Sequence, residues 1–474
     1  MRHADPASTA PRAAVLVHND AENDARVLKE SETLRRHGAR VRIIAVERRL
    51  RGRTAGLTTL APGLDRLRVP EFALDRIAPS LAARWRRSLG VGSGAATPST
   101  SPSPAADPSA PIPQPAAAPA SPTLRSRVAA AARVGAERGF RWVSLLSYWA
   151  RAARAAHEFR PDVIHANDAN TLVPAAAVKL LSRGRVAIVY DSHELWRHRN
   201  VDRTPVIGPA LDAVMEGLGI RAADAVLTVS PSIVHHLQRT YSLPVAPALV
   251  RNVPAAAPIP STSDGVLRER AGLGEEDKVI AYGGRITAAR GIEETIAALP
   301  HLPATVHFVL LGYGEDADLE RVHRTAASAG VSERVHLVGA VAPDAVSRSL
   351  ADGDVAVVHV RPVCLSYRYA LPNKLFESIR AGLPVAVADL PDMRAVVEEL
   401  GVGEVFTAED PEDLAATLAA ILADPEPYRE RSRAAAAQLT WEHEAEAMID
   451  RYRHLPTVGE RLGSPVPADG EEAS

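Results

Sequence analysis

Short apolar runs alternate with longer amphipathic segments along most of this chain. The apolar run at 13–19 suits a buried strand, and the segment 24–38 places its apolar residues on one helical face before Gly38 ends it. A second apolar run follows at 41–47. This order of strand, helix and strand predicts a parallel β-α-β unit at the start of the fold.

The same alternation returns after residue 161 and continues in two series. The first predicts strands at 162–166, 185–191, 225–230 and 246–252, separated by helices at 169–182, 206–222 and 231–241. After a linker at 253–264, the second predicts strands at 278–284, 305–312, 334–339, 355–361, 384–389 and 403–406. We therefore predict two doubly wound α/β domains, 13–252 and 265–440, with ligands at the carboxyl ends of their strands. A last helix is expected at 441–455, with flexible ends at 1–12 and 456–474.

Residues 51–160 interrupt this alternation. A Pro-, Ala- and Ser-rich stretch at 90–122 cannot form an apolar core, and we expect it to be disordered. The segment 124–159 is basic and contains Trp142 and Trp149. Two interpretations of it stay open: a helix that lies on an anionic membrane surface, or an ordinary amphipathic helix with a solvated arginine face.

Composition narrows the class of protein. The chain is 46% hydrophobic and 24% charged with a net charge of −2, which is ordinary for a globular protein and gives no reason to expect a nucleic-acid partner. Its one cysteine, Cys364, excludes an intrachain disulfide and fits a reducing cytoplasm. The N-terminus has no apolar signal region, and no run approaches about 18 apolar residues. We expect a cytoplasmic protein, located at the inner face of the membrane if segment 124–159 binds lipid.

The segment 361–389 is typical of a nucleotide site. It reads as strand, loop, helix, turn and strand, and we expect its helix to open at Pro372. Lys374 then lies in the first turn and Glu377 in the second. A helix N-terminus with a nearby lysine suits a phosphate, and a carboxylate one turn later can accept hydrogen bonds from ribose hydroxyls. Together these groups indicate a site for a sugar nucleotide.

Two arginines follow the first strand of the second series. Arg285 and Arg290 lie five residues apart in a short loop, after Gly284, which lets the backbone approach a ligand closely. Two guanidinium groups at a strand end suit a diphosphate. The alternative is that both arginines face solvent. The GYGED segment at 312–316 lacks the full dinucleotide fingerprint and is interpreted as a tight turn.

Polar clusters also follow two neighbouring strands of the first series. They are HAND at 165–168 and DSHE at 191–194, and together they form a crevice of the kind that binds ligands. Asp168 is placed to cap the helix that follows it. The DGD string at 352–354 precedes a buried strand and is interpreted as a turn, not a metal site.

The segments GGRITAARG and PNKLFESIRAGLPVAVAD resemble the C-terminal domain of family-four retaining glycosyltransferases with the GT-B fold. That family has the pattern G-R-x-x-x-x-K-G for the donor diphosphate; Arg285 matches its arginine, and Arg290 stands where lysine is usual. Of the two glutamates that the family commonly has eight positions apart, the ribose ligand corresponds to Glu377, whereas the first falls on Tyr369. The chain resembles a variant in which a Pro-Asn-Lys-Leu-Phe-Glu segment supplies Lys374 and a helix N-terminus instead.

The first domain carries the resemblance as well. HAND and DSHE resemble the His-Ala-His-Asp and Asp-Ser-His-Glu signatures of the family, with Asn167 in place of the second histidine. HNDAENDARVLKE at 18–30 resembles the first loop of the family, although its usual Gly-Gly pair is absent.

The resemblance implies two Rossmann-like domains that face a central cleft, with the last helix packed back on the first domain. It implies catalytic roles for Asp168, His193, Arg285 and Arg290; donor contacts from Gly284, Arg285, Arg290, Asn373, Lys374, Leu375 and Glu377; and acceptor-side positions for Asn19, Asp24, Arg26, Asn167 and Glu194. The implied reaction moves a sugar, with retention, from a UDP- or GDP-sugar to a hydroxyl of a sugar, lipid-linked or polysaccharide acceptor. No metal or other cofactor is expected.

Three alternatives stay open. An epimerase or hydrolase of nucleotide sugars on the same architecture would need a carboxylate pair that stabilises an eliminated intermediate. A non-catalytic partner subunit that only binds nucleotide or membrane is favoured by Tyr369. An NAD-dependent oxidoreductase is disfavoured because the full Gly-x-Gly-x-x-Gly fingerprint is absent.

Overall fold

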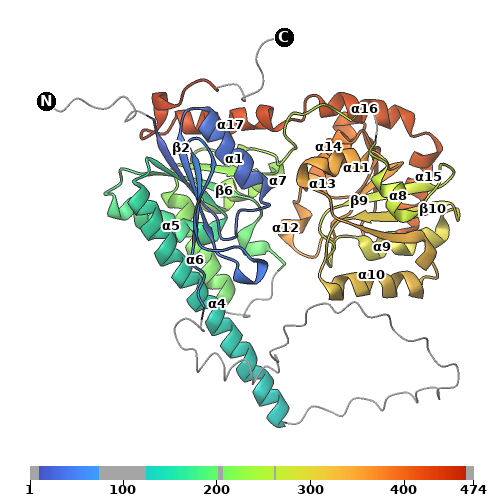
Figure 1. Ribbon diagram of the computed structural model, residues 1–474, viewed down its shortest axis with the longest axis horizontal. Helices are drawn as coiled ribbons and strands as arrows, with labels where there is room; N and C mark the ends of the chain where they lie inside the picture. Colours follow the sequence, from blue (N-terminus) through green and yellow to red (C-terminus); the bar gives the residue numbers. More distant parts are fainter. Residues whose placement is uncertain (1–9, 74–123, 201–206, 261–262, 466–474) are drawn as a thin grey trace. The chain divides into compact units, whose positions relative to one another are not determined.

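A computed structural model describes residues 10–73, 124–200, 207–260 and 263–465 (Figure 1). The first sheet has eight strands in the order β3-β4-β2-β1-β5-β6-β7-β8, and all neighbours are parallel except β3 and β4. Its strands are β1 (Arg12–Leu16), β2 (Arg40–Val46), β3 (Gly56–Ala61), β4 (Leu64–Val69), β5 (Val163–Asn167), β6 (Ala187–Ser192), β7 (Ala225–Thr228) and β8 (Ala248–Leu249). Its helices are α1 (Ala25–Arg36), α4 (Leu124–Phe159), α5 (Ala169–Leu181), α6 (Ile207–Ala222) and α7 (Pro231–Tyr241).

The second sheet has six parallel strands in the order β11-β10-β9-β12-β13-β14. They are β9 (Lys278–Gly283), β10 (Val306–Leu311), β11 (Val335–Gly339), β12 (Val355–Val358), β13 (Val385–Ala388) and β14 (Gly403–Phe406). The helices around them are α8 (Val266–Ala271), α9 (Ile292–Ala298), α10 (Asp316–Ser328), α11 (Val346–Leu350), α12 (Leu365–Arg368), α13 (Asn373–Arg380), α14 (Pro391–Leu400), α15 (Pro411–Ala423) and α16 (Glu426–Ala436). The predicted pair of doubly wound domains is confirmed.

Parallel pairing places the polar clusters of the first domain together. β1 lies between β2 and β5, and β5 lies between β1 and β6, with Asn167 directly opposite Asp191. The central strands are apolar and buried on both faces, which is why they appear in the sequence as continuous apolar runs. Their carboxyl ends therefore carry the polar residues to one edge of the sheet.

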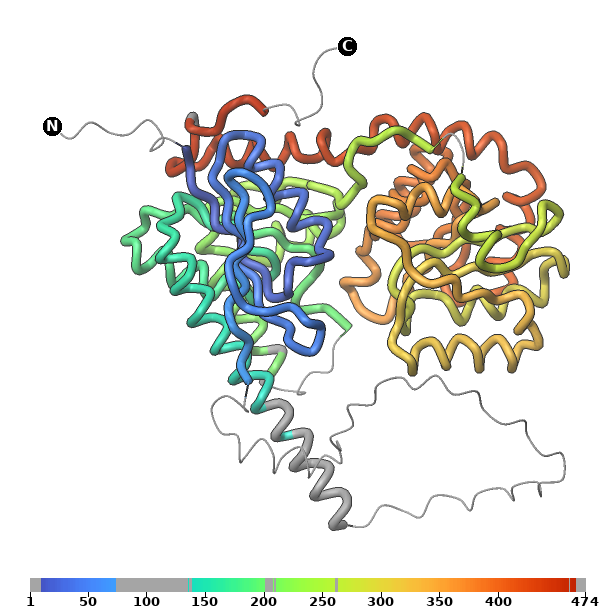
Figure 2. The backbone as a smooth tube through the Cα atoms, in the orientation of Figure 1, coloured from blue at the N-terminus to red at the C-terminus, as the bar shows by residue number. Residues whose placement is uncertain are grey.

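The last helix, α17 (Trp441–Arg453), packs on the first domain, as predicted (Figure 2). Its first residue donates its backbone N–H to the Pro254 carbonyl at 2.8 Å, and the Trp441 indole Nε1–H donates to Thr33 Oγ1 on α1 at 2.9 Å. Trp441 is 3% exposed. The chain thus passes from one sheet to the other at the linker and returns at α17.

The prediction for residues 51–160 was partly wrong. β3 and β4 form a hairpin that extends the first sheet; its sequence signal is weak because β3 is exposed along almost its whole length. At the end of α4, Ala152, Ala156 and Phe159 are buried with the first sheet. The stretch 90–122, for which disorder is predicted, lies outside the described residues.

The segment after residue 455 was also predicted to be flexible, and its first part is packed instead. Val458 is 2% and Leu462 7% exposed, and Gly463 donates its N–H to the His37 carbonyl at 3.0 Å. Two apolar side chains spaced four residues apart explain this packing, because they share one face of a short turn.

Among the helices that the structure describes, none combines the length and the apolar character needed to cross a membrane.

Candidate active site

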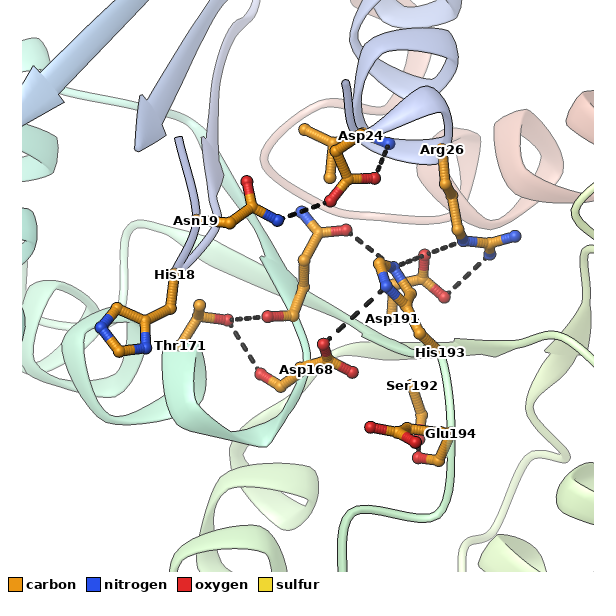
Figure 3. Close-up of polar contacts among 12 residues, drawn as sticks. His18, Asn19, Asp24, Arg26, Asp168, Thr171, Asp191, Ser192, His193 and Glu194 are labelled. Atoms are coloured by element: carbon orange, nitrogen blue, oxygen red, sulfur yellow. Dashed lines mark hydrogen bonds and ion pairs between the residues drawn. The ribbon is translucent and has the colours of Figure 1, made fainter. Parts of the chain in front are cut away.

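Polar side chains meet at the carboxyl edge of the first sheet, where α1, β5 and β6 converge (Figure 3). Asp191 is fully buried and binds Arg26 through two hydrogen bonds: Arg26 Nε donates to Oδ2 at 2.7 Å and Nη2 to Oδ1 at 2.9 Å. Burial would raise the pKa of Asp191, but Arg26 and His193 more than offset it and hold this pKa well below its usual value. Asp191 is therefore the anionic centre of the site.

His193 contacts the Asp191 carboxylate directly. Its Nε2 is 3.1 Å from Asp191 Oδ2 and 3.1 Å from Asn167 Oδ1, while its Nδ1 faces Asp168 Oδ2 at 3.9 Å. Burial alone would lower the pKa of His193, but Asp168 and Asp191 raise it to about 10. At neutral pH the ring is thus an imidazolium whose Nδ1–H points to the Asp168 carboxylate without a direct hydrogen bond.

Asp168 occupies an unusual backbone conformation. Its φ of 62° and ψ of 160° lie in a region that is almost restricted to glycine. The predicted helix cap is wrong: no backbone amide of α5 donates to the Asp168 side chain, and the Thr171 hydroxyl instead donates to the Asp168 carbonyl at 2.9 Å. Oδ1 of Asp168 is buried and has no hydrogen-bond partner among the described residues, and burial raises the pKa of this carboxyl. The strained backbone aims the carboxylate at His193 rather than at the helix.

Three further buried residues complete the network: Glu30, His165 and Tyr452. The sequence placed His165 in the HAND cluster at this strand end without a role, whereas Glu30 and Tyr452 were not among the candidate site residues. Glu30 Oε1 pairs with Arg26 Nε at 2.9 Å, and Glu30 Oε2 pairs with His165 Nε2 at 3.2 Å. His165 Nδ1 lies 2.6 Å from the Tyr452 hydroxyl oxygen of α17. A signal existed for Glu30, which follows Arg26 by one helical turn; Tyr452 lies too far along the chain for any local pattern to reveal it.

A metal ion is not needed to explain this cluster. Glu30, Asp191 and His193 place potential ligand atoms within 4.8 Å of one another. However, the Arg26 guanidinium already pairs with both carboxylates. We therefore interpret the cluster as an ion-pair network rather than a metal centre.

The loop between β1 and α1 also contributes polar side chains to this edge of the first sheet. Asn19 Nδ2 donates to Asp24 Oδ2 at 2.7 Å, and Asp24 Oδ1 accepts the Val27 N–H at 3.3 Å and so caps α1. Arg26, predicted on the acceptor side, is 3% exposed and acts mainly by holding Asp191. Glu194 is more open and lies 3.5 Å from Arg199 Nη1.

In the second domain, Lys374 lies in the first turn of α13. This helix begins at Asn373, one residue later than predicted, because Pro372 has an extended backbone and occupies the N-cap position. Nζ of Lys374 contacts the Tyr282 hydroxyl and lies 3.6 Å from the ring centroid. Its stem crosses Gly284, where a Cβ atom would come within 2.8 Å of Lys374 Cε. Burial, and then Arg290, lower the pKa of Lys374 well below its usual value.

The other predicted donor residues are spread around this lysine. Glu377 accepts a hydrogen bond from the Ser347 hydroxyl, and burial raises its pKa. Arg290 lies over the Tyr367 ring at 5.1 Å, whereas Arg285 is 54% exposed and 3.4 Å from Glu315. Leu375 is also a predicted donor residue; its side chain is fully buried in the domain core, which leaves its backbone for such a contact.

A cavity of about 240 Å³ joins the two halves of the site. Its lining comes from both domains and includes Asp24, Arg26, His193, Glu194, Arg290 and Asn373. It also includes Ser366, Tyr367, Ala370, Leu371 and Pro372. Six residues predicted from sequence are thus brought together, whereas Arg285, Lys374 and Glu377 do not line this cavity.

Two family descriptions match the chain: "Glycosyl transferases group 1" at residues 265–438 and "Glycosyltransferase Family 4" at residues 96–252. The D-inositol 3-phosphate glycosyltransferase of Xylanimonas cellulosilytica is 30% identical over 289 residues, which are 57% of this chain and 67% of that protein. The chain belongs to the family of GT-B glycosyltransferases that these matches define, and it is a glycosyltransferase.

Solved structures support the fold. Sucrose-phosphate synthase from Thermosynechococcus elongatus superimposes with a TM-score of 0.65 at 16% identity, covering 94% of this chain and 98% of that one. Anabaena HepE, solved in complex with UDP-glucose, superimposes with a TM-score of 0.62 at 16% identity, covering 94% and 100%. Both similarities establish the GT-B architecture.

Proposed function

We propose that this glycosyltransferase moves a sugar from a UDP- or GDP-sugar to an acceptor hydroxyl with retention of the anomeric configuration. The observation that carries this proposal is the cavity in which Arg290 and Asn373 of one domain face His193 and Glu194 of the other. Such a cavity can hold a donor and an acceptor at once. The UDP-glucose complex of HepE, which has the same fold, supports a nucleotide-sugar donor.

The donor diphosphate binds to the second domain in this proposal. Arg290 and the first turn of α13 supply a guanidinium and free backbone N–H groups, which together neutralise an anion. Lys374 is held against Tyr282 with a lowered pKa, and a diphosphate beside it would restore its full charge. Arg285 is exposed at the same strand end and extends the positive surface. These cations stabilise the charge that grows on the leaving diphosphate, and we propose that they do so without a metal ion.

Glu377 is proposed to bind the ribose. Its carboxylate already accepts a hydrogen bond from Ser347, and its position on the second turn of α13 is the one that the family resemblance assigns to a ribose ligand. Gly284 leaves room for the lysine stem between this helix and β9. Asn373 then lies between the nucleotide and the cavity.

On the acceptor side, the proposed place for the acceptor hydroxyl is beside His193 Nδ1 and Asp168 Oδ2, which are 3.9 Å apart and can both reach one hydroxyl oxygen. The imidazolium can donate to the hydroxyl oxygen, and the Asp168 carboxylate can accept its hydrogen, so the hydroxyl is oriented by both. During transfer the hydroxyl hydrogen turns from the Asp168 carboxylate to the departing phosphate oxygen, which takes the proton. Asn19, Asp24, Arg26, Asn167 and Glu194 shape and support this side.

The acceptor is proposed to be a sugar, a polysaccharide end or a lipid-linked sugar of the cell envelope. The membrane interpretation rests on α4, where Trp142, Val143 and Leu146 are 36%, 45% and 54% exposed. A cytoplasmic protein with such a helix could bind the inner face of the membrane. The competing interpretation, an amphipathic helix with a solvated arginine face, predicts no binding to neutral or anionic vesicles, whereas the membrane interpretation predicts binding to anionic ones; co-sedimentation with each distinguishes the two.

Tests of the reaction start from the donor. A thermal-shift screen of UDP, GDP, ADP, TDP and their sugars identifies the nucleotide, and NMR of the product made with a matching acceptor gives its anomeric configuration. Inversion at the anomeric carbon contradicts the proposed retention. Release of free sugar or an epimer without acceptor favours an epimerase or hydrolase, and tight nucleotide binding without turnover favours a partner subunit.

A further inference from the structure

One carboxylate lies between the N-termini of two helices that belong to different domains. Asp392, in the first turn of α14, is 5% exposed. Its oxygens accept the backbone N–H of Ser232 at 3.2 and 3.3 Å, and Oδ1 also accepts the Ser232 hydroxyl at 2.9 Å. Ser232 lies in the first turn of α7, so the second domain caps a helix of the first.

The usual local cap of α7 is absent. Ser230 occupies its N-cap position, but the Ser230 side chain does not accept a backbone N–H of the helix. Its hydroxyl donates to the Tyr369 carbonyl at 2.8 Å, across the same boundary. Ser230 is fully buried. The side chain best placed to cap the helix locally is thus used to join the domains.

A third buried contact lies nearby. The backbone N–H of Leu195, just after β6, donates to Ser366 Oγ at 3.2 Å, and Ser366 is 3% exposed. Ser366 belongs to α12 and Tyr369 follows that helix directly. Both of these bonds therefore hold one segment, 365–373, and that segment supplies most of the wall of the cavity on the second-domain side, together with Arg290.

We propose that Asp392, Ser230 and Ser366 form a latch that holds segment 365–373 against the first domain, so that the cavity is complete only while the latch is closed. They are positioning residues, since none of their bonds involves the catalytic groups. The N-terminal dipoles of α7 and α14 both carry positive charge toward Asp392, and without its negative charge these helix ends repel each other. The latch therefore depends on the charge of Asp392 as well as on its hydrogen bonds.

The test measures the distance between the domains in the full chain. In a Cys364→Ser background, spin labels are attached at Leu181→Cys on α5, where the native side chain is 64% exposed, and at Ala327→Cys, an exposed position on α10. Pulsed electron paramagnetic resonance then gives the populations of joined and separated domains. We expect Asp392→Asn to lower the ratio of joined to separated molecules about tenfold, which corresponds to about 1.4 kcal/mol and lies within the range of a lost helix cap. Adding Ser230→Ala lowers the ratio further.

The matched control is Asp389→Asn, which removes the same charge three residues earlier from an exposed carboxylate that pairs with Arg394. It is expected to leave the distances unchanged. The affinity for UDP or GDP should change less than threefold in Asp392→Asn, because the residues proposed to bind the diphosphate all lie in the second domain. The latch proposal is wrong if Asp392→Asn and the double variant both give the same distance distribution as the parent. Because the readout is a distance, this outcome is independent of whether the sugar-transfer proposal holds.

Discussion

Asp168 combines two costs in one residue: a backbone conformation suited to glycine and a buried carboxylate oxygen without a partner among the described residues. Such strain typically costs about 1–3 kcal/mol. We expect Asp168→Gly to raise the free energy of unfolding by about 1 kcal/mol while sugar transfer falls strongly, as measured by urea denaturation and initial rates. Asp168→Asn keeps the strain and should lose activity without gaining stability; a fully active Asp168→Gly enzyme contradicts the assigned role.

Arg290 is the second-domain arginine that lines the cavity, and its removal tests donor binding. Deleting a charge-assisted contact to a diphosphate usually costs about 1.5–3 kcal/mol. Arg290→Ala should therefore weaken UDP or GDP binding roughly 10- to 100-fold by calorimetry, and Lys374→Ala should act in the same direction. Arg324→Ala, on the exposed side of α10, removes an equal charge and should bind as the parent does. If Arg290→Ala binds UDP or GDP as tightly as the parent, the proposed diphosphate site at Arg290 is wrong.

At the scale of the element, the Tyr452 hydroxyl is one of the buried groups that hold α17 on the first domain. Tyr452→Phe leaves His165 Nδ1 buried without that partner, which typically costs about 1–3 kcal/mol. We expect this loss of unfolding free energy by urea denaturation, with little change for Tyr428→Phe, whose hydroxyl bonds Glu404 at the surface. Equal stability of the two variants would show that the hydroxyl contributes nothing to docking α17.

Local patterns predicted most elements but not the connections that fix the site. Strands such as β1 and β13 are continuous apolar runs, so their burial and parallel pairing follow from composition. The exposed strand β3 has no such signal. In the site, HAND and DSHE were found because they follow strands directly. The partners Tyr452 and Asp392 were not found, because they contact residues more than 150 positions away and only the tertiary fold brings them there.

For the whole molecule, the buried ion network predicts how stability depends on pH. Burial lowers the pKa of His165, but Glu30 and Asp191 more than offset it and raise the value to about 9. A pKa above the unfolded value of about 6.5 means that the stabilisation is complete below that pH and is lost as pH rises toward 9. The slope is at most ~1.4 kcal/mol per pH unit for this group.

The measurement is the free energy of unfolding in urea at pH 6, 7, 8 and 9, compared between the parent and His165→Gln. Lys29, whose pKa is lowered to about 8 by burial and Arg26, acts in the opposite direction above pH 8, but it is present in both proteins and cancels in the difference. The parent should lose its advantage over the variant as pH rises. His454→Gln, at an exposed site, should follow the parent. A difference that does not depend on pH contradicts a charged His165.

The return of α17 has a consequence for dissecting this enzyme. A gene cut at the linker would separate residues 1–253 from the helix that carries Trp441 and Tyr452, and the first fragment would then expose the surface against which those side chains pack. The two halves should consequently be poorly soluble when expressed alone and should recover when they are co-expressed. Split reporters or domain-exchange chimeras built on this scaffold therefore need α17 fused to the first half.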